Sequence, residues 1–175
     1  GIRKFSPDGA VLWTYRPDPS VQEEQLFAVP SLWGDSLFAC TREARLFSLD
    51  LASGRERWSR RHAERATWDA SYVEAIDGMV LAAVDGHGPM TDEYGNRRVI
   101  AVNASTGDLA WEYRGGASLW NFMPLSPGDG TVVFTDMTGG VYRLDLRSGA
   151  PLWHSPAPEA ASGSWTDGGV ILGPN

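Results

Sequence analysis

The chain has 175 residues, enough for one domain with a sizeable core, and its 20 Gly and 11 Pro exceed what a helical protein would carry. The formal net charge of -7 argues against a nucleic-acid-binding surface, and the single Cys40 excludes an internal disulfide. No apolar run approaches the roughly 20 residues that a transmembrane helix needs. No window shows a sustained helical apolar stripe, so we expect an all-β fold.

One motif occurs four times along the chain. A loose copy, KFSPDGAVLW (4–13), is followed by SLDLASGRERW (48–58), AVNASTGDLAW (101–111) and RLDLRSGAPLW (143–153). Each copy has a glycine four residues before a tryptophan, and the pairs are Gly9–Trp13, Gly54–Trp58, Gly107–Trp111 and Gly149–Trp153. The tryptophans are 45, 53 and 42 residues apart. A period in the forties, built from short strands, predicts the blades of a β-propeller.

The residues around each glycine predict a β-hairpin. Apolar residues alternate along 46–51 and along the two equivalent segments, which is typical of a half-buried strand. Asp50, Asn103 and Asp145 can each close an Asx-turn, and the glycine that follows can take a positive φ. The second strand carries the tryptophan, whose large ring we expect to wedge its blade against the next.

Another strand pair precedes each full hairpin, with a turn at Gly34-Asp35, Asp77-Gly78 or Asp129-Gly130. Each unit therefore has four strands, which we name A to D from the propeller axis outward. We divide this single propeller region into strands C and D of one blade (1–17), three blades (18–61, 62–114 and 115–156), and strands A and B of a further blade (157–175). The two half-blades could close a four-bladed ring. We favour a piece of a seven- or eight-bladed propeller, which needs about twice this length.

The motif resembles the pyrroloquinoline-quinone (PQQ) repeat, or tryptophan-docking motif, of quinoprotein-like β-propellers. The residues that carry the resemblance are Leu49-Asp50 to Trp58, Val102-Asn103 to Trp111 and Leu144-Asp145 to Trp153. In the first copy, Phe5 replaces the Asp. The resemblance implies a propeller and a periplasmic or other extracytoplasmic location. It implies no single activity, because such repeats occur in enzymes, assembly scaffolds and sensor domains.

The longest departure from the repeat is DGHGPMTDEYGNRR (85–98), which we place between strands B and C of the second full blade. It offers His87, Asp92 and Glu93 as possible ligand-binding residues, and Asp92, Glu93 and Asn96 could coordinate calcium through oxygen atoms. We favour the alternative of a solvated, variable loop. The sequence places no Ser, Cys or carboxylate partner beside His87, so a catalytic base is not predicted there.

A second series of aromatic residues falls in the D–A connections. Trp68, Trp120 and Trp165 each stand shortly before a predicted strand A, and Asp69 and Asn121 follow two of them. These side chains could ring the mouth of the central funnel, where a ligand could stack on the indoles. The alternative, to which we give more weight, is that they fill the hub between blades.

Two classes of function fit the sequence. We favour a non-catalytic scaffold that binds a protein or small ligand at the funnel face, with the remaining blades of a longer chain as a further partner. The alternative is part of a PQQ-dependent dehydrogenase, for which the resemblance implies PQQ and calcium in the funnel and oxidation of alcohols or sugars. The adjacent cysteine pair of many such enzymes is absent, and their metal ligands and catalytic aspartate cannot be matched. We therefore assign no catalytic or metal-binding residue. A generic antiparallel sandwich gives no reason for four Gly-x-x-x-Trp copies.

Overall fold

The computed structural model describes residues 1–16, 26, 29–64, 66, 72–85, 96–156 and 169–173. In this part of the chain the strands form four antiparallel sheets, and within each sheet neighbouring strands follow the order of the sequence. The strands are β1 (Ile2–Phe5), β2 (Val11–Tyr15), β3 (Ser31–Trp33), β4 (Ser36–Cys40), β5 (Arg45–Asp50), β6 (Glu56–Arg61), β7 (Val73–Ile76), β8 (Met79–Val84), β9 (Asn96–Asn103), β10 (Leu109–Leu119), β11 (Thr131–Thr135), β12 (Val141–Asp145) and β13 (Pro151–Ser155).

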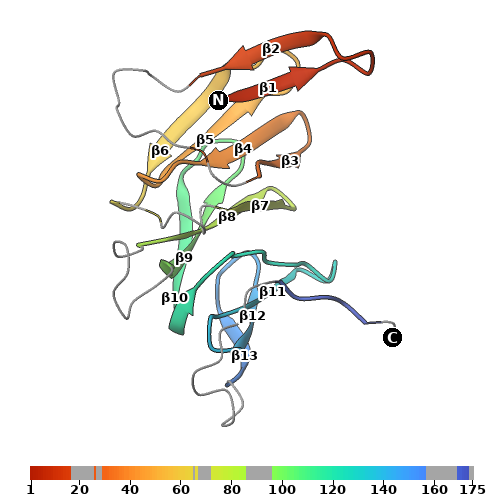
Figure 1. Ribbon diagram of the computed structural model, residues 1–175. Coiled ribbons are helices and arrows are strands. Elements are labelled where there is room, and N and C mark those ends of the chain that lie inside the picture. The colour runs from red at the N-terminus through yellow and green to blue at the C-terminus, as the bar shows by residue number, and fades with distance from the viewer. Residues whose placement is uncertain are drawn as a thin grey trace.

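The sheets are stacked face to face in chain order, from β1–β2 at one end to β11–β13 at the other (Figure 1). The β3–β6 and β7–β10 sheets have four strands each. In the β11–β13 sheet, an isolated bridge between Leu125 and Val133 stands where the innermost strand would lie. The predicted all-β architecture of four-stranded antiparallel propeller blades is confirmed.

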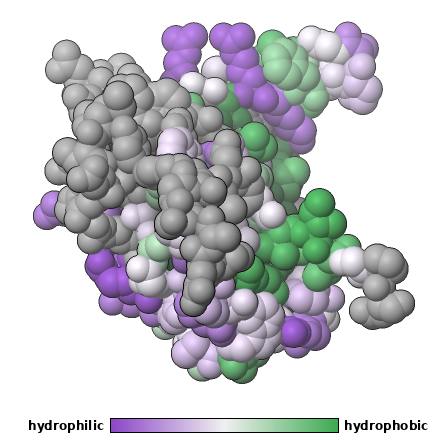
Figure 2. All heavy atoms as spheres, turned by 60° about the horizontal axis from the view of Figure 1, so that its bottom comes forward, coloured by the Kyte–Doolittle hydropathy of each residue, from purple (hydrophilic) through white to green (hydrophobic). Residues whose placement is uncertain are grey.

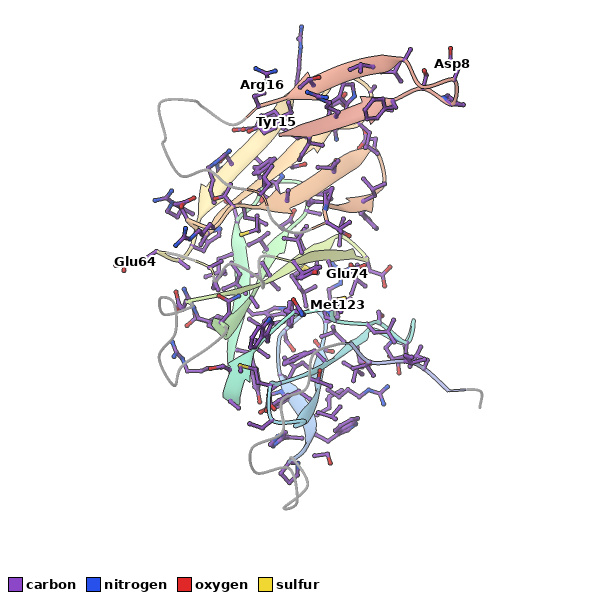
Figure 3. All side chains as sticks on the ribbon, viewed as in Figure 1. Asp8, Tyr15, Arg16, Glu64, Glu74 and Met123 are labelled. Atoms are coloured by element: carbon purple, nitrogen blue, oxygen red, sulfur yellow. The ribbon has the colours of Figure 1, made fainter. Side chains whose placement is uncertain are left out.

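The core consists of apolar layers between neighbouring sheets. Trp13 and Tyr15 of β2 pack against Phe47 and Leu49 of β5, and the Tyr15 and Phe47 ring centroids are 5.1 Å apart. Figure 3 shows Tyr15 on the side of its sheet that faces β5 and β6. The next layer joins Phe38, Trp58, Val80 and Ile100, and the third joins Leu81, Trp111, Phe134 and Tyr142. Side chains that are far apart in sequence therefore form every layer.

The prediction that the first strand of each hairpin is half-buried is wrong for the middle sheets. Residues 46–49 of β5 are all buried, and so is every residue of β4 and β8. These strands have a sheet on each side, so both of their faces are covered. In the terminal β11–β13 sheet, β12 keeps the expected alternation of buried and half-buried residues.

The strand β10 continues to Leu119, beyond residue 114, where we placed the end of its blade. Its pairing with β9 shifts register between Arg114 and Leu119. Two glycines lie in this irregular part, and a Cβ on Gly115 or Gly116 would lie 3.3 Å from the Tyr142 side chain. The missing side chains let β10 run on beside the β11–β13 sheet. The predicted blade limits themselves stay a prediction.

The predicted half-blades do not pair within the described residues. Residues 169–173 form no strand, and β1–β2 is a separate two-stranded sheet. Gly169 lies against Met123, whereas the N-terminus is at the opposite end of the stack (Figure 1). The described part of the chain is therefore an open arc, and the four-bladed ring is not what it forms.

Candidate functional site

Three of the four motif tryptophans dock on the following sheet through the same contact. The indole Nε1–H of Trp58 donates to the backbone oxygen of Ala104 at 2.9 Å, and that of Trp111 donates to Leu146 O at 2.9 Å. The Nε1–H of Trp13 donates to Leu51 O at 3.1 Å. The accepting residue is in each case the first residue after the turn Asp or Asn. Each ring is buried or half-buried and its polar atom is satisfied.

The motif glycine lies under the docked ring. Gly54, Gly107 and Gly149 have φ of +70°, +74° and +70°, where a side chain is strained. A Cβ at these positions would lie 2.6, 2.5 and 2.6 Å from the rings of Trp13, Trp58 and Trp111, respectively. Glycine is thus required twice, for the backbone angle and for the approach of the neighbouring indole.

A β-bulge precedes each motif tryptophan. In the β5–β6 pair, Ser48 faces Trp58 but Leu49 faces Glu56, so Arg57 is the extra residue. The same shift occurs in the β1–β2, β9–β10 and β12–β13 pairs, at Leu12, Ala110 and Leu152. A bulge increases local twist and redirects a side chain. We infer that it aims the indole at the next sheet.

The turn residues connect the two hairpins of one blade. The Oδ1 atom of Asp50 accepts from the backbone N of Ser53 at 2.7 Å, and the Oδ1 atoms of Asn103 and Asp145 accept in the same way from Thr106 N and Ser148 N. The backbone N–H of the next residue, Leu51, donates to Asp35 O of the A–B turn at 2.9 Å. Equivalent bonds join Ala104 to Gly78 and Leu146 to Gly130. The residue after the turn Asp or Asn therefore makes two links. Its N–H donates to the A–B turn of its own blade, and its C=O accepts from the tryptophan of the preceding blade.

Asp50 makes this turn pH-sensitive. Hydrogen bonds from Arg57, and then from Ser53, hold the pKa of Asp50 well below its usual range. A carboxylate whose folded-state pKa is depressed stabilises the fold above the unfolded value of about 3.9, and this contribution is lost as the pH falls through the folded-state pKa. We expect Asp50→Asn to lower the urea midpoint at pH 7 and to flatten its dependence on pH between about 5 and 2. Asn103 carries an amide at the equivalent position and serves as the control. An Asn103→Glu change should not reproduce the pH dependence of the urea midpoint that Asp50 gives.

The motif differs at the two ends of the chain. The pairing of Phe5 with Val11 matches that of Leu49 with Glu56, so Ser6, and not Phe5, occupies the Asp position. Its Oγ accepts from the backbone N of Ala10 at 3.0 Å, and the turn is one residue shorter than the others. Gly9 has φ +90° with no atom within 4 Å of its Cβ direction.

At the other end, Trp153 is 44 % exposed, whereas Trp58 and Trp111 are each 7 % exposed. Figure 3 shows Asp8 at the tip of the N-terminal hairpin, which projects beyond the β3–β6 sheet. Gly9 and Trp153 are therefore unoccupied halves of the docking contact among the described residues.

The structure brings few of the candidate funnel residues together. Trp120 and Asn121 follow β10 directly; both are half-buried, neither lacks an interaction partner, and Asn121 has a φ of +44°. Six candidates lie outside the described residues: Trp68, Asp69, His87, Asp92, Glu93 and Trp165. Asn96, proposed as a loop ligand for calcium, is the first residue of β9 and is fully buried. The strand thus begins before the loop was expected to end, and the calcium hypothesis stays a prediction because Asp92 and Glu93 lie outside the described residues.

The base of the 85–98 insertion is held by charge pairs. Arg98 on β9 pairs through Nε with Asp85 Oδ2 at 2.7 Å, and its Nη1 atom contacts Glu112 on β10. Its Nη2 atom donates to the backbone oxygen of His62 at 2.8 Å. This arginine therefore joins strands C and D of one blade to the end of the preceding one.

The described residues contain no cluster of three or more His, Cys, Asp or Glu side chains suited to a metal ion. Within the same residues, no helix is long and apolar enough to cross a membrane. The thiol of Cys40 is buried in the layer beside Phe38, and burial raises its pKa to about 12. It is a core side chain and not a reactive thiol.

The PQQ_2 family, described as "Outer membrane protein assembly factor BamB", matches residues 1–169. The chain belongs to this family of PQQ-repeat β-propellers. The PQQ-repeat chain is 31% identical over 125 residues to the serine/threonine-protein kinase AfsK of Streptomyces griseus, covering 69% of this chain and 14% of the kinase. It is 29% identical over 114 residues to the quinohemoprotein alcohol dehydrogenase ADH IIB of Pseudomonas putida, covering 60% of this chain and 16% of the enzyme.

Solved structures show the same fold. BamB from Moraxella catarrhalis matches with a TM-score of 0.65 and 18% identity, over 83% of this chain and 40% of that one. The quinohemoprotein alcohol dehydrogenase from Comamonas testosteroni matches with a TM-score of 0.63 and 19% identity, over 85% and 30%. The PQQ-repeat chain thus spans less than half of each of these proteins.

One polar cluster of this PQQ-repeat chain had no signal in the sequence. Asp136, which is 3 % exposed, follows β11 and accepts from the backbone N of Thr138 and of Gly140, each at 2.9 Å. Its Oδ2 accepts from the Tyr142 hydroxyl at 2.7 Å, and that hydroxyl accepts from Gly116 N at 2.9 Å. Burial, followed by the bond to Asp136, raises the pKa of Tyr142 to about 12. The cluster joins β10 to the β11–β13 sheet.

We expect Tyr142→Phe to lower the free energy of unfolding by about 1–3 kcal/mol, because it removes the two hydrogen bonds that the hydroxyl makes with the buried Asp136 carboxylate and with Gly116 N–H. Urea denaturation at pH 7 measures the loss. Tyr113→Phe is the control, since this ring packs at 6.0 Å from Tyr142 and its hydroxyl has no hydrogen bond among the described residues. Equal losses in the two variants would contradict a specific role for the Tyr142 hydroxyl.

Proposed function

We propose that the chain is a non-catalytic PQQ-repeat scaffold that binds a protein or a small ligand at its funnel face. We define this face as the end of the blades that carries the B–C and D–A connections. One observation carries the proposal: in three of the four copies the recurring indole, as in Trp58 and Trp111, is used to dock one blade on the next. The repeated residues build the frame and supply no chemistry, so activity has to reside in what the connections present.

The relatives support this division between frame and activity. The matching proteins carry names as different as a serine/threonine-protein kinase, an alcohol dehydrogenase and an outer membrane protein assembly factor. Proteins with such different names are expected to share a propeller fold when the repeat is a structural scaffold and the activity resides elsewhere. An extracytoplasmic location belongs to the same proposal, and the family's description as an outer membrane protein assembly factor favours it.

The second candidate is part of a PQQ-dependent dehydrogenase, with PQQ and calcium as cofactors. The 29% identity to ADH IIB over 114 residues favours it. Trp120 is the one indole of the D–A series within the described residues, and in this candidate a planar ligand would stack on it.

A titration separates the two candidates. The chain is mixed with PQQ and calcium chloride, and binding is followed by tryptophan fluorescence and by PQQ absorbance. The scaffold predicts no saturable binding at tens of micromolar PQQ and no ethanol-dependent reduction of a dye. Saturable binding that Trp120→Leu abolishes and Trp153→Leu leaves intact, together with dye reduction, would instead establish the dehydrogenase.

Photocrosslinking tests the scaffold directly. A photoreactive amino acid is placed at Trp120, which follows the end of β10, or at Thr106, which lies in the turn before its start. The two positions are therefore at opposite ends of the same strand. We expect a discrete cross-linked partner in cells of the source organism from Trp120 only. Equal labelling from both positions, or from Thr106 alone, would contradict a funnel-face binding site.

A further inference from the structure

An arginine recurs three residues after the motif tryptophan. The first three copies read WTYR (13–16), WSRR (58–61) and WEYR (111–114), so the arginines are Arg16, Arg61 and Arg114. Figure 3 shows Arg16 and Asp8 at opposite ends of the β1–β2 sheet, and Asp8 belongs to the turn between these strands. The recurring arginine therefore lies at the other end of strand D, where the D–A connection begins. This is the funnel-face end of three successive blades.

In the β3–β6 and β7–β10 sheets, this arginine faces a second arginine across the pairing of strands C and D. Arg45 is opposite Arg61, and Arg98 is opposite Arg114. Like charges directly opposite each other in an antiparallel pair are destabilising. The fold itself gains nothing from such a pair, yet it occurs in two neighbouring blades of a chain whose formal net charge is -7. A repeated departure from local stability is expected at a functional site.

The arginine on strand C is neutralised within its own blade. Arg45 is 15 % exposed and pairs with Glu56 at 3.2 Å. Arg98 is 16 % exposed, pairs with Asp85 at 2.7 Å and also contacts Glu112. These two side chains therefore have their partners inside the frame of the blades.

The arginine on strand D remains available. Arg61 is exposed and forms no ion pair with the described residues. Arg114 is 59 % exposed and reaches only Asp85, at 3.8 Å, which Arg98 already holds. The two available arginines are also neighbours in space, because Nη2 of Arg98, which faces Arg114, donates at 2.8 Å to the backbone oxygen of His62, the residue after Arg61. They form one row that crosses from blade to blade.

A small pocket opens beside the row. Its volume is about 140 Å³, and its lining among the described residues is Arg114, Gly115, Gly116, Ala117 and Ser118. It lies where the pairing of β10 with β9 shifts register, and the two glycines leave it without side chains on that part of its wall. One water occupies about 30 Å³ of liquid, so the pocket has room for the carboxylate end of a side chain.

We propose that this arginine row, Arg61 and Arg114 with Arg16 at the equivalent position, binds an acidic segment of a partner protein in extended conformation. This inference rests on the proposed function and names the chemistry of its partner. One carboxylate of the segment enters the pocket beside Arg114, and the next carboxylate pairs with Arg61. Each guanidinium then gains a charge-assisted hydrogen bond, and the repulsion between the facing arginines is relieved.

Spacing and charge favour a peptide over a membrane or a nucleic acid. Stacked sheets pack about 10 Å apart and an extended chain advances about 3.3 Å per residue, so carboxylates three residues apart match successive blades. The chain as a whole, at -7, repels an anionic lipid surface and a nucleic acid, whereas a narrow row can still attract single carboxylates. Figure 2 shows hydrophilic side chains projecting at the periphery of the molecule, with hydrophobic surface at the right of the view. Strand D is the outermost strand of its blade, so a segment bound there meets charge.

Fluorescence anisotropy tests the row with the 175-residue chain and labelled peptides. The probe peptide carries three glutamates, one at every third position, with serine and threonine between them. The control peptide has the same composition with the three glutamates adjacent. In about 20 mM salt, where charges are little screened, the spaced peptide should bind saturably and about ten-fold more tightly than the adjacent one. Equal binding of the two peptides would overturn the proposal.

A pair of double variants places the binding site. Arg61→Gln/Arg114→Gln should weaken binding of the spaced peptide by about ten-fold. Arg55→Gln/Arg147→Gln is the matched control, because it makes the same change in net charge at two exposed arginines in turns between strands C and D, at the opposite end of the blades. It should change the affinity by less than about two-fold. All four side chains are exposed, so the variants keep the fold, which circular dichroism verifies. Equal losses in the two double variants would overturn the row.

The stability of the free chain distinguishes binding from a structural role. Arg61→Gln removes one member of a like-charge pair, so it should not lower the urea midpoint. A lower midpoint would mean that Arg61 serves the fold, and would overturn its assignment to a partner.

Two other outcomes separate this proposal from its alternatives. Cosedimentation with vesicles of phosphatidylcholine and phosphatidylglycerol should show no binding. Vesicle binding that Arg61→Gln/Arg114→Gln abolishes, without binding of the peptide, would assign the row to a lipid surface and overturn the proposal. If the peptide does not bind but a photoreactive group at Trp120 still captures a discrete partner, the arginine row is wrong and the scaffold function stands.

Discussion

Trp111→Ala is expected to lower the free energy of unfolding by about 3–5 kcal/mol, the cost of removing a large buried aromatic ring. The ring lies in the layer between β7–β10 and β11–β13, it covers Gly149, and its Nε1–H satisfies Leu146 O. Truncation opens a cavity between two sheets and leaves a buried carbonyl without its donor. Urea denaturation, with the slope m checked for constancy, measures the change.

Two further variants separate the parts of this effect. Trp111→Phe keeps most of the apolar contact and removes the hydrogen bond, so it should cost about 1–2 kcal/mol. Trp33→Ala removes an indole that is 42 % exposed and rests on Gly78 at ordinary contact distance, and it should cost less than half of the Trp111→Ala loss. If Trp111→Ala costs under half a kilocalorie, the ring does not hold the two sheets together.

The sequence predicted the residues that recur and missed the features with no residue signature. Gly54, Gly107 and Gly149 could be found because three copies need the same residue for the same reason. The accepting carbonyls could not be found, because any residue supplies one; they belong to Leu51, Ala104 and Leu146. The bulge was missed for the same reason, since its extra residue is a leucine twice, an arginine and an alanine.

Features that occur once are harder still. Ser6 occupies the Asp position, but the sequence analysis assigned that position to Phe5. Counting four residues back from Gly9 gives Phe5, because this turn is one residue shorter than the others. Asp136 and Tyr142 form a buried pair in one blade only, so no repetition marks them. The alternating pattern also could not reveal that β5 is covered on both faces, which depends on sheets contributed by distant parts of the chain.

The candidate funnel residues had the weakest basis for prediction. The conformation of a connection between strands depends on its length and on the surface that it covers, and neither of these repeats along this chain. Asn96 shows the consequence: it was grouped with Asp92 and Glu93 as a loop ligand, yet it begins β9 with its side chain buried. For such residues a position between two strands predicts a surface, and a ligand has to be found by experiment.

Gly107→Ala is expected to lower the free energy of unfolding by about 2–5 kcal/mol, although it adds a single methyl group. Two effects combine. A φ of +74° costs an L-residue about 1–2 kcal/mol. In addition, the new Cβ would lie 2.5 Å from Cε3 of Trp58 and 2.9 Å from Cγ of Arg60, so the docked ring has to move. Displacing a packed ring costs about 1–3 kcal/mol more.

Gly9→Ala is the matched control for the backbone effect. Its φ of +90° is also in the left-handed region, but no atom lies within 4 Å of the added Cβ. It should therefore show the backbone cost alone, about 1–2 kcal/mol. In Gly107→Ala/Trp58→Ala the steric contribution of the Trp58 ring should vanish and only the contact with Arg60 remains, so the double variant should lose less than the sum of the single variants. Equal losses in unfolding free energy at Gly9 and Gly107, or strict additivity in the double variant, would contradict this prediction. Gly107 would then be required only for the backbone angle of its turn, and not for the packing of the preceding blade's indole.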